Sequence, residues 1–315
     1  MFLTYQNPLP IKNIGDPFIL RAQDGLYYCY ATSAADGFKA WASPDLVHWQ
    51  AIGYVYRRQS DSWGESDFWA PEVVFYRNKY FMHYSARWGK NQSLRMGVAI
   101  AESPRGPFVD ISNRPMFDFG YAAIDGHVFF DEDGRKYFYY SRDCSENIVA
   151  ERHESHLYVV ELDDDLVSFR SEPILIAKPE QDWETCHSEE WRWNEGPFML
   201  KHAGTYYLMY SANFYASREY AVGYALAENP TGPFRKAAHN PVLASSCPEI
   251  SGPGHNSVTV APDGKSLVIA YHIHTDPRQP SGDRQVCIDR MGFHPDGSLF
   301  VDGPSNTLQS LLKNG

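Results

Sequence analysis

The chain has 315 residues, of which 43% are hydrophobic and 21% charged, so it is long and apolar enough to bury a substantial core. Its 28 basic and 39 acidic residues give a formal charge of −11, which argues against nucleic-acid binding and disfavours a polyanionic substrate. A neutral ligand is compatible with this charge.

The cysteines and the first residues bear on the cellular compartment. The five cysteines are scattered without a CxxC pair, which argues against a disulfide framework and a Cys-rich zinc site. The opening residues, MFLTYQNPLPIKN, lack a basic segment followed by a long apolar one, and no run of 18 apolar residues exists. We therefore expect a cytoplasmic protein without a signal peptide, a membrane span or a nucleic-acid partner.

Short β-rich runs recur along the chain between turns that contain Gly, Pro, Asp or Asn, and long helical periodicity is absent. Five copies of one unit contain a short apolar strand, a turn, a second aromatic strand and then a third segment. In chain order the copies read DPFILRAQDGLYYCYAT from Asp16, APEVVFYRNKYFMHYSA from Ala70, DGHVFFDEDGRKYFYYS from Asp125, EGPFMLKHAGTYYLMYS from Glu195 and GHNSVTVAPDGKSLVIAYH from Gly254.

A spacing of roughly 55–70 residues between copies is too long for one hairpin and suits a four-stranded sheet. Radial repetition of such sheets produces a β-propeller. We therefore predict an all-β fold, a five-bladed β-propeller with four-stranded antiparallel blades, with two packed sheets as the alternative. No low-complexity linker divides the chain, so residues 1–315 are predicted to form a single domain.

Acidic residues and a histidine stand at or near the start of each copy. In a propeller the first strand of every blade lines the central channel, so residues at matching positions converge on one mouth. The residues assigned to this position are Asp16, Glu72, Asp125, Glu195 and His255. Acids at strand starts can also make turns, but several acids converging on one axis favour a functional cluster.

A cluster of carboxyl groups in a confined pocket separates their pKa values, so that one group donates a proton while another stays ionised. This pair is the minimum that hydrolysis of a glycosidic bond requires, because one carboxylic acid protonates the leaving oxygen and the other activates water or attacks the anomeric carbon. Three aromatic residues near the same mouth, Phe18, Trp69 and Phe198, are candidates for stacking on a sugar face.

Five motifs, in this order and spacing, make the chain resemble glycoside hydrolase family 43 from Asp16 to about Asp302. They are GDPF (15–18), WAPE (69–72), AIDGHVFFDEDGRKYF (123–138), NEGPFMLKHAGTYYLMYS (194–211) and GPGHNSV (252–258). The resemblance implies a five-bladed propeller and hydrolysis with inversion of the anomeric centre. It also implies that Asp16 is the general base and that Glu195 is the general acid. Asp125 is implied to orient Glu195 and to keep the pKa of Glu195 high.

The resemblance extends to three further residues. His255 is similar to the channel histidine that helps to hold a central metal ion, commonly Ca²⁺, through waters, and no organic cofactor is implied. Arg284 resembles the arginine that reaches the sugar in the innermost subsite, and Trp69 resembles a wall of that subsite.

Several neighbouring residues leave alternatives open. His127 stands where the pattern departs from the family, and it either reaches the substrate or faces away from it. In CHSEEWRWNEG, Glu189 and Glu190 are assigned to a solvated loop because neither begins the first strand of a repeat. Trp191 and Trp193 either border the leaving-group site or pack under the loop.

The resemblance implies activity on α-L-arabinofuranosides, arabinans or β-D-xylosides. Only about a dozen residues follow Asp302, whereas many β-xylosidases of the family carry a β-sandwich there, so we expect an α-L-arabinofuranosidase that uses neutral, arabinose-containing oligosaccharides. An intracellular enzyme would meet short imported oligosaccharides, which favours exo action. A β-D-xylosidase and an endo-arabinanase are the alternatives. A non-catalytic sugar-binding propeller is the opposing class, and the presence of all three carboxylates argues against it.

Overall fold

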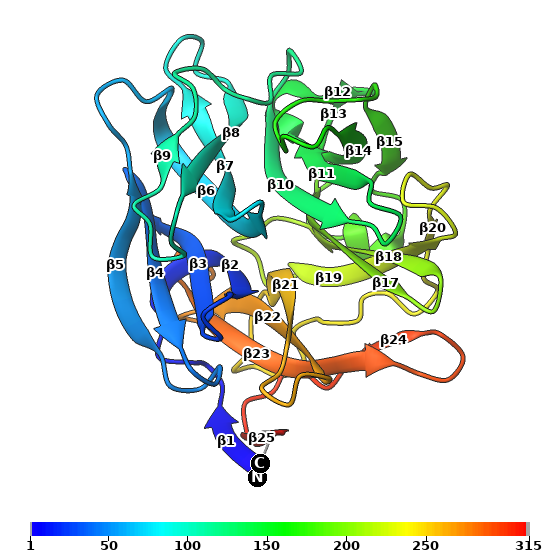
Figure 1. Ribbon diagram of the computed structural model, residues 1–315. Helices are drawn as coiled ribbons and strands as arrows, with labels where there is room; N and C mark the ends of the chain where they lie inside the picture. The colour runs from blue at the N-terminus through cyan, green and yellow to red at the C-terminus, as the bar shows by residue number, and fades with distance from the viewer. Residues whose placement is uncertain (1, 313–315) are drawn as a thin grey trace.

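The computed structural model describes residues 2–312 and consists almost entirely of β-strands (Figure 1). The first two units contain β2 (Lys12–Arg21), β3 (Tyr27–Ala34), β4 (Gly37–Ser43) and β5 (Gln50–Arg57), and then β6 (Gly64–Tyr76), β7 (Lys79–Trp88), β8 (Leu94–Ala101) and β9 (Val109–Asp110). The third and fourth contain β10 (Ala123–Phe130), β11 (Lys136–Arg142), β14 (His156–Leu162) and β15 (Ile174–Ala177), and then β17 (Asn194–His202), β18 (Thr205–Ala212), β19 (Ala221–Ala227) and β20 (Arg235–Lys236). The fifth contains β21 (Gly254–Val260), β22 (Leu267–His274), β23 (Arg284–Phe293) and β24 (Leu299–Val301). Within each unit the strands pair antiparallel in chain order, which confirms the all-β prediction.

The remaining elements lie outside these units. A small sheet combines β12 (Ile148–Val149), β13 (Arg152–Glu154) and β16 (Trp191–Arg192), and β1 (Phe2–Gln6) pairs antiparallel with β25 (Leu308–Leu312). Two short 3-10 helices are η1 (Cys144–Glu146) and η2 (Asp182–Glu184). Among the described residues, none belongs to a helix long and apolar enough to cross a membrane. All five cysteines are free, as their spacing predicted.

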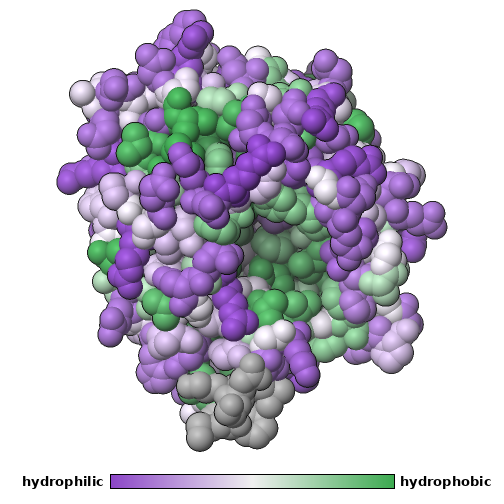
Figure 2. All heavy atoms as spheres, in the orientation of Figure 1, coloured by the Kyte–Doolittle hydropathy of each residue, from purple (hydrophilic) through white to green (hydrophobic). Residues whose placement is uncertain are grey.

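The core is divided among the faces of neighbouring units. Each of the five largest clusters of buried apolar side chains combines residues of two successive units, and one of them joins the fifth unit to the first. The inner strands are therefore covered on both faces, which explains their long apolar and aromatic runs, such as TYYLMYSA in β18. The first unit also pairs directly with the fifth, because the beginning of β2 hydrogen-bonds to β23. The units follow one another around a common centre (Figure 1), and Figure 2 shows a central hollow on the same face.

A bulge interrupts the first strand of every unit and places one residue in the left-handed backbone region. The five residues are Asp16 (φ 55°), Ala70 (45°), Asp125 (61°), Gly196 (55°) and His255 (50°). We call this the left-handed position. This position differs from the repeat alignment made from the sequence. The second unit has Ala70 there instead of Glu72, and the fourth has Gly196 instead of Glu195.

The amide of every residue at the left-handed position donates a hydrogen bond to a side chain of the preceding unit. Asp125 N–H donates to Ser85 Oγ at 2.9 Å, and Asp16 N–H donates to His272 Nδ1 at 3.2 Å. The remaining three amides donate to Thr32, Asp125 and Ser211. These bonds fix the strand starts relative to one another, and so they position the side chains that face the centre.

Candidate active site

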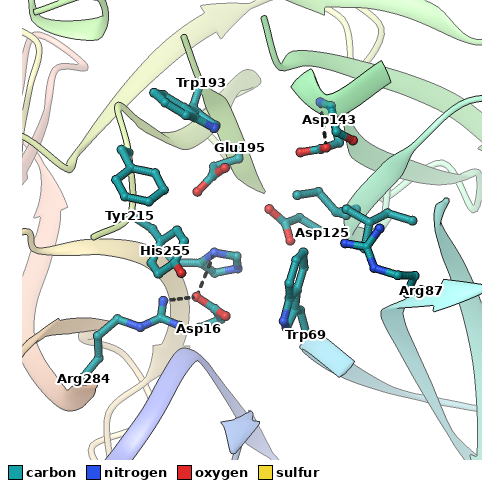
Figure 3. Close-up of a pocket in the computed structure, with 14 residues that line it drawn as sticks. Asp16, Trp69, Arg87, Asp125, Asp143, Trp193, Glu195, Tyr215, His255 and Arg284 are labelled. Carbon is teal, nitrogen blue, oxygen red and sulfur yellow. Dashed lines mark hydrogen bonds and ion pairs between the residues drawn. The ribbon is translucent and has the colours of Figure 1, made fainter. Parts of the chain in front are cut away.

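A cavity of about 290 Å³ brings together the three acids that the sequence singled out (Figure 3). Asp16 comes from β2, Asp125 from β10 and Glu195 from β17, and all three side chains line the cavity. Asp16 and Asp125 occupy the left-handed position, whereas Glu195 stands one residue before it. Three different units therefore supply the acids of one site.

Asp16 is surrounded by hydrogen-bond donors and by basic side chains. Its Oδ1 accepts a hydrogen bond from Arg284 Nη1 at 2.8 Å and lies 3.3 Å from His255 Nδ1, while its Oδ2 accepts one from Thr32 Oγ1 at 2.6 Å. Burial alone would raise the pKa of Asp16, but Arg284, His255, His272 and the Thr32 hydrogen bond together lower the pKa far below the ordinary aspartate value. Asp16 is therefore ionised, as a general base must be.

Glu195 has the opposite environment. Burial is the main cause that raises the pKa of Glu195 well above its ordinary value, and the neighbouring charge of Asp125 adds to the rise. Its Oε1 accepts a hydrogen bond from the Tyr220 hydroxyl at 2.8 Å, which leaves Oε2 to carry the proton. Tyr220 packs against Gly254, where a Cβ atom would lie 2.1 Å from the ring.

Asp125 faces the other two acids from a third unit and fixes the backbone beside Glu195. Its Oδ2 accepts a hydrogen bond from the amide of Gly196 at 3.0 Å. Burial raises the pKa of Asp125 to about 6; His255 opposes this rise and the charge of Asp16 adds to it. Ionised Asp125 in turn raises the pKa of Glu195.

Trp69, His255 and Arg284, the other residues singled out from the sequence, also line the cavity. Arg284 reaches Asp16 across Gly15, where a Cβ atom would overlap the guanidinium group. Two aromatic candidates, Phe18 and Phe198, are placed differently and do not line the cavity. Their ring centroids lie 6.5 Å apart, and Phe198 is 6% exposed.

Phe18, Phe198, Glu72 and His127 all stand two residues beyond the left-handed position of their units, and contacts link them into one group outside the cavity lining. His127 Nδ1 lies 2.7 Å from Glu72 Oε2, and the His127 ring lies 4.4 Å from that of Phe198. Phe18 and Phe198, expected near the mouth, and Glu72, expected in the acid cluster, do not line this cavity. The bulge turns the strand, so residues after it do not face the cavity.

The segment before Glu195 divides between solvent and site. Glu189 and Glu190 are exposed and do not line the cavity, as expected. Trp193 lines the cavity, whereas Trp191 does not and is 37% exposed.

Sequence reasoning missed Arg87 and Asp143, which also line the cavity. Asp143 is buried, and its Oδ1 accepts a hydrogen bond from Ser145 N–H at 2.9 Å. Both residues stand two positions after a serine at the end of a second strand, in the phrases HYSAR and YYSRD. Aligning the ends of the second strands as well as the starts of the first would have found them. Tyr220, which donates a hydrogen bond to Glu195, does not follow a strand-end serine in this way.

His255 is the residue assigned to a metal ion by the family resemblance. Its Nδ1 faces the carboxylate of Asp16, and within residues 2–312 no group of three or more His, Cys, Asp or Glu side chains is arranged to hold a metal ion. Direct ligation of Ca²⁺, which takes six to eight oxygen ligands, does not fit these residues. A calcium ion bound through waters stays a prediction, and no catalytic step below depends on it.

Comparison with known proteins identifies the family. The model of glycosyl hydrolases family 43 matches residues 5–299. The crystal structure of a thermostable family-43 glycoside hydrolase is 50% identical in sequence and matches with a TM-score of 0.92. The match covers 96% of this chain and 97% of that one. A β-D-galactofuranosidase of Aspergillus niger is 30% identical over 87% of this chain and 78% of its own length. An extracellular exo-α-(1→5)-L-arabinofuranosidase of Streptomyces chartreusis is 26% identical over 85% of this chain and 82% of its own length. The family model matches nearly the whole chain, and an ionised and a protonated carboxyl group face one cavity. The chain therefore belongs to glycosyl hydrolase family 43 and hydrolyses glycosidic bonds.

Proposed function

We propose that the protein is an inverting, exo-acting α-L-arabinofuranosidase that releases arabinose from neutral oligosaccharides. The observation that carries this proposal is the contrast between Asp16 and Glu195, which face one cavity with pKa values shifted in opposite directions. Such a pair supplies the base and the acid of a single displacement.

In the proposed reaction, ionised Asp16 takes a proton from a water molecule as that water attacks the anomeric carbon. Glu195 gives its proton to the glycosidic oxygen as the bond from that oxygen to the anomeric carbon breaks. Asp125 positions the acid through the Gly196 amide and keeps the pKa of Glu195 high. Exchange of protons with solvent then returns Asp16 to its ionised form and Glu195 to its protonated form.

The size of the cavity supports exo action on a terminal sugar. About 290 Å³ is just below the range for small-molecule pockets, roughly 300–1,000 Å³. Arabinofuranosidases among the relatives support an arabinofuranoside as the substrate. A β-D-galactofuranoside is a second candidate, because the galactofuranosidase relative also acts on a five-membered sugar ring.

The proposal includes the architecture around the site. We propose that the five units are the blades of one catalytic propeller domain, closed where β2 pairs with β23. The core cluster that joins the fifth unit to the first supports this closure.

A panel of nitrophenyl glycosides tests the substrate. We expect release from the α-L-arabinofuranoside; release mainly from the β-D-galactofuranoside or the β-D-xyloside would assign the other sugar instead. Proton NMR of the fresh product should show the inverted anomer. No release from any arabinofuranoside, galactofuranoside or xyloside, including the natural oligosaccharides, would contradict the proposal.

Two substitutions test the roles of the acids. Asp16→Asn and Glu195→Gln should each lower kcat by about 10²–10⁴-fold, because each removes one proton transfer. Glu195→Gln is best measured on an arabinobioside, since nitrophenolate leaves without needing a proton. Glu190→Gln, an exposed acid of the same segment, is the matched control. Near-wild-type turnover in either variant would remove that residue from the mechanism.

A further inference from the structure

Three aromatic side chains form a row that leads from the cavity to the surface. Phe214 and Trp193 line the cavity, and their ring centroids lie 5.4 Å apart. The ring of Trp191 follows at 6.3 Å from that of Trp193, with the two planes inclined by only 20°. We call Phe214, Trp193 and Trp191 the aromatic row; its outer member is 37% exposed.

The small sheet outside the units holds the outer end of this row in place. β16 pairs in parallel with β13, which sets Trp191 opposite His153, and the two rings stack at 3.9 Å with an angle of 5°. The amide of Trp191 donates a hydrogen bond to Ser188 Oγ at 3.1 Å. Trp191 and Trp193 are two residues apart on an extended segment, so they project to the same side. The row is therefore already arranged before any ligand arrives.

The row begins on the side of the cavity from which the leaving group must depart. Figure 3 shows Trp193 beside Glu195, whereas Arg87 and Asp143 lie across the cavity, beyond Asp125. A general acid must contact the oxygen of the leaving group. The part of the substrate beyond the broken bond therefore passes Glu195 and meets Trp193.

We infer that the aromatic row binds the sugar units on the leaving-group side of a neutral oligosaccharide, at least as far as Trp191. This inference rests on the proposed function. Aromatic faces offer a broad apolar surface to the C–H groups of sugar rings and need no charge on the ligand. Ile148, 65% exposed on β12, stands opposite His153 on the other side of β13 and adds a further apolar side chain to the same small sheet. Because the row is continuous with the cavity, the substrate itself is the occupant that fits it.

The test compares kcat/KM along a series of α-1,5-linked arabino-oligosaccharides of two to five units, or of β-1,4-linked xylo-oligosaccharides if the enzyme cleaves xylosides. For the wild type we expect kcat/KM to rise from the disaccharide to the tetrasaccharide, mainly through a lower KM. In Trp191→Ala this gain should shrink about three- to tenfold, the effect of losing one aromatic contact. Trp191→Phe, which keeps a ring, should retain part of the gain.

Tyr54→Ala is the matched control, because Tyr54 is an aromatic residue of similar exposure, 41%, on the distant strand β5. It should keep the full dependence on chain length. Titration of the Asp16→Asn variant with oligosaccharide, followed by tryptophan fluorescence, gives a readout independent of turnover. We expect this variant to bind the tetrasaccharide more tightly than the disaccharide. The double variant Asp16→Asn, Trp191→Phe should bind the tetrasaccharide more weakly than Asp16→Asn alone.

The inference would be overturned if Trp191→Ala kept the wild-type gain with chain length, or if the wild type showed no gain at all. Loss of self-association in Trp191→Ala with an unchanged chain-length dependence would also overturn it, by showing that the row serves a protein contact. An enzyme that cleaves no arabinofuranoside, galactofuranoside or xyloside would instead contradict the proposed function.

Discussion

At the scale of single residues, the site separates two similar carboxyl groups by what surrounds them. Asp16 is buried among an arginine, two histidines and a hydroxyl group, whereas Glu195 is buried beside another acid and receives only the Tyr220 hydroxyl. Burial acts in the same direction on both pKa values, so the charged neighbours decide the outcome. Arg284 is the strongest of the neighbours that keep Asp16 ionised.

Arg284→Met should therefore move the acidic limb of the pH profile. As the proposed base, Asp16 works only when ionised, so activity should be lost as the pH falls through the pKa of Asp16, which Arg284 lowers in the wild type. Without that charge the pKa rises, and the acidic limb of kcat/KM should move up by about 1–2 pH units. Arg290→Met, an exposed arginine of the same strand paired with Asp302, is the control and should leave the limb in place. An unmoved limb in Arg284→Met would show that other groups keep Asp16 ionised.

The sequence was sufficient to identify the acids, but not to show which residue of each repeat occupies the left-handed position. Asp16 and Glu195 could be predicted because each opens an apolar strand within a repeat. The alignment treated them as equivalent, but the left-handed position of the fourth unit is Gly196, and that of the second is Ala70 rather than Glu72. A bulge adds one residue without changing the apolar pattern, so the sequence does not show which side chain turns inward.

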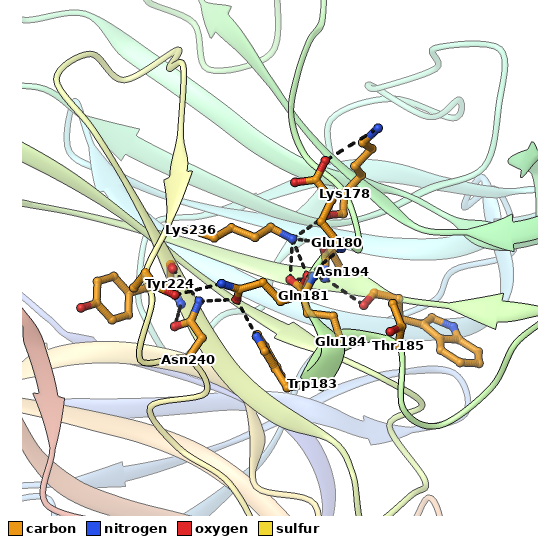
Figure 4. A network of polar contacts seen from close by, with 12 residues as sticks. Lys178, Glu180, Gln181, Trp183, Glu184, Thr185, Asn194, Tyr224, Lys236 and Asn240 are labelled. Carbon is orange, nitrogen blue, oxygen red and sulfur yellow. Dashed lines mark hydrogen bonds and ion pairs between the residues drawn. The ribbon is translucent and has the colours of Figure 1, made fainter.

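At the scale of elements, a buried polar network supports the strand that carries Glu195 (Figure 4). Lys236 Nζ of β20 lies 2.5 and 2.7 Å from the two carboxylate oxygens of Glu184 in η2, and the Glu184 side chain has no exposed surface. Glu184 also accepts hydrogen bonds from the amides of Glu180 and Gln181, and one at 3.2 Å from Nδ2 of Asn194, the residue before the acid. The network thus joins η2, β17 and β20.

Lys236→Met should destabilise the protein strongly. The substitution leaves the Glu184 carboxylate buried without its counter-charge, which costs about 3–5 kcal/mol of the free energy of unfolding. Lys178→Met is the matched control, because the partly exposed ion pair of Lys178 with Glu180, 3.7 Å apart, should contribute less than about 1 kcal/mol. Urea denaturation of both variants measures the difference, and equal stabilities would mean that Glu184 is neutral or hydrated.

At the scale of the whole molecule, both ends of the described chain help to join the fifth unit to the first. β1 pairs with β25, and Leu311 packs into the cluster that contains Ile14 of the first unit and Val286 of the fifth. Ile14 lies two residues before Asp16 on β2, so this contact and the proposed general base share one strand. The repeat predicted five units, but β1 and β25 are too short and too ordinary in composition to have been predicted as partners.

Leu311→Ala should lower the free energy of unfolding by about 2–5 kcal/mol, because Leu311 is 3% exposed and its loss leaves a cavity. Leu308→Ala, on the same strand but 68% exposed, should change it by less than about 0.5 kcal/mol. Thermal unfolding of both variants distinguishes them. An equal, small effect would show that the β1–β25 pair contributes little to the junction.

The left-handed position has a consequence for how such a site persists. Asp16, Asp125 and His255 adopt a backbone conformation that non-glycine residues disfavour by about 1–2 kcal/mol each. Glycine at either aspartate position would relax the main chain but remove a carboxyl group from the cavity. The site therefore carries a backbone cost at the positions that supply its acids, and a variant optimised for stability alone would sacrifice hydrolysis.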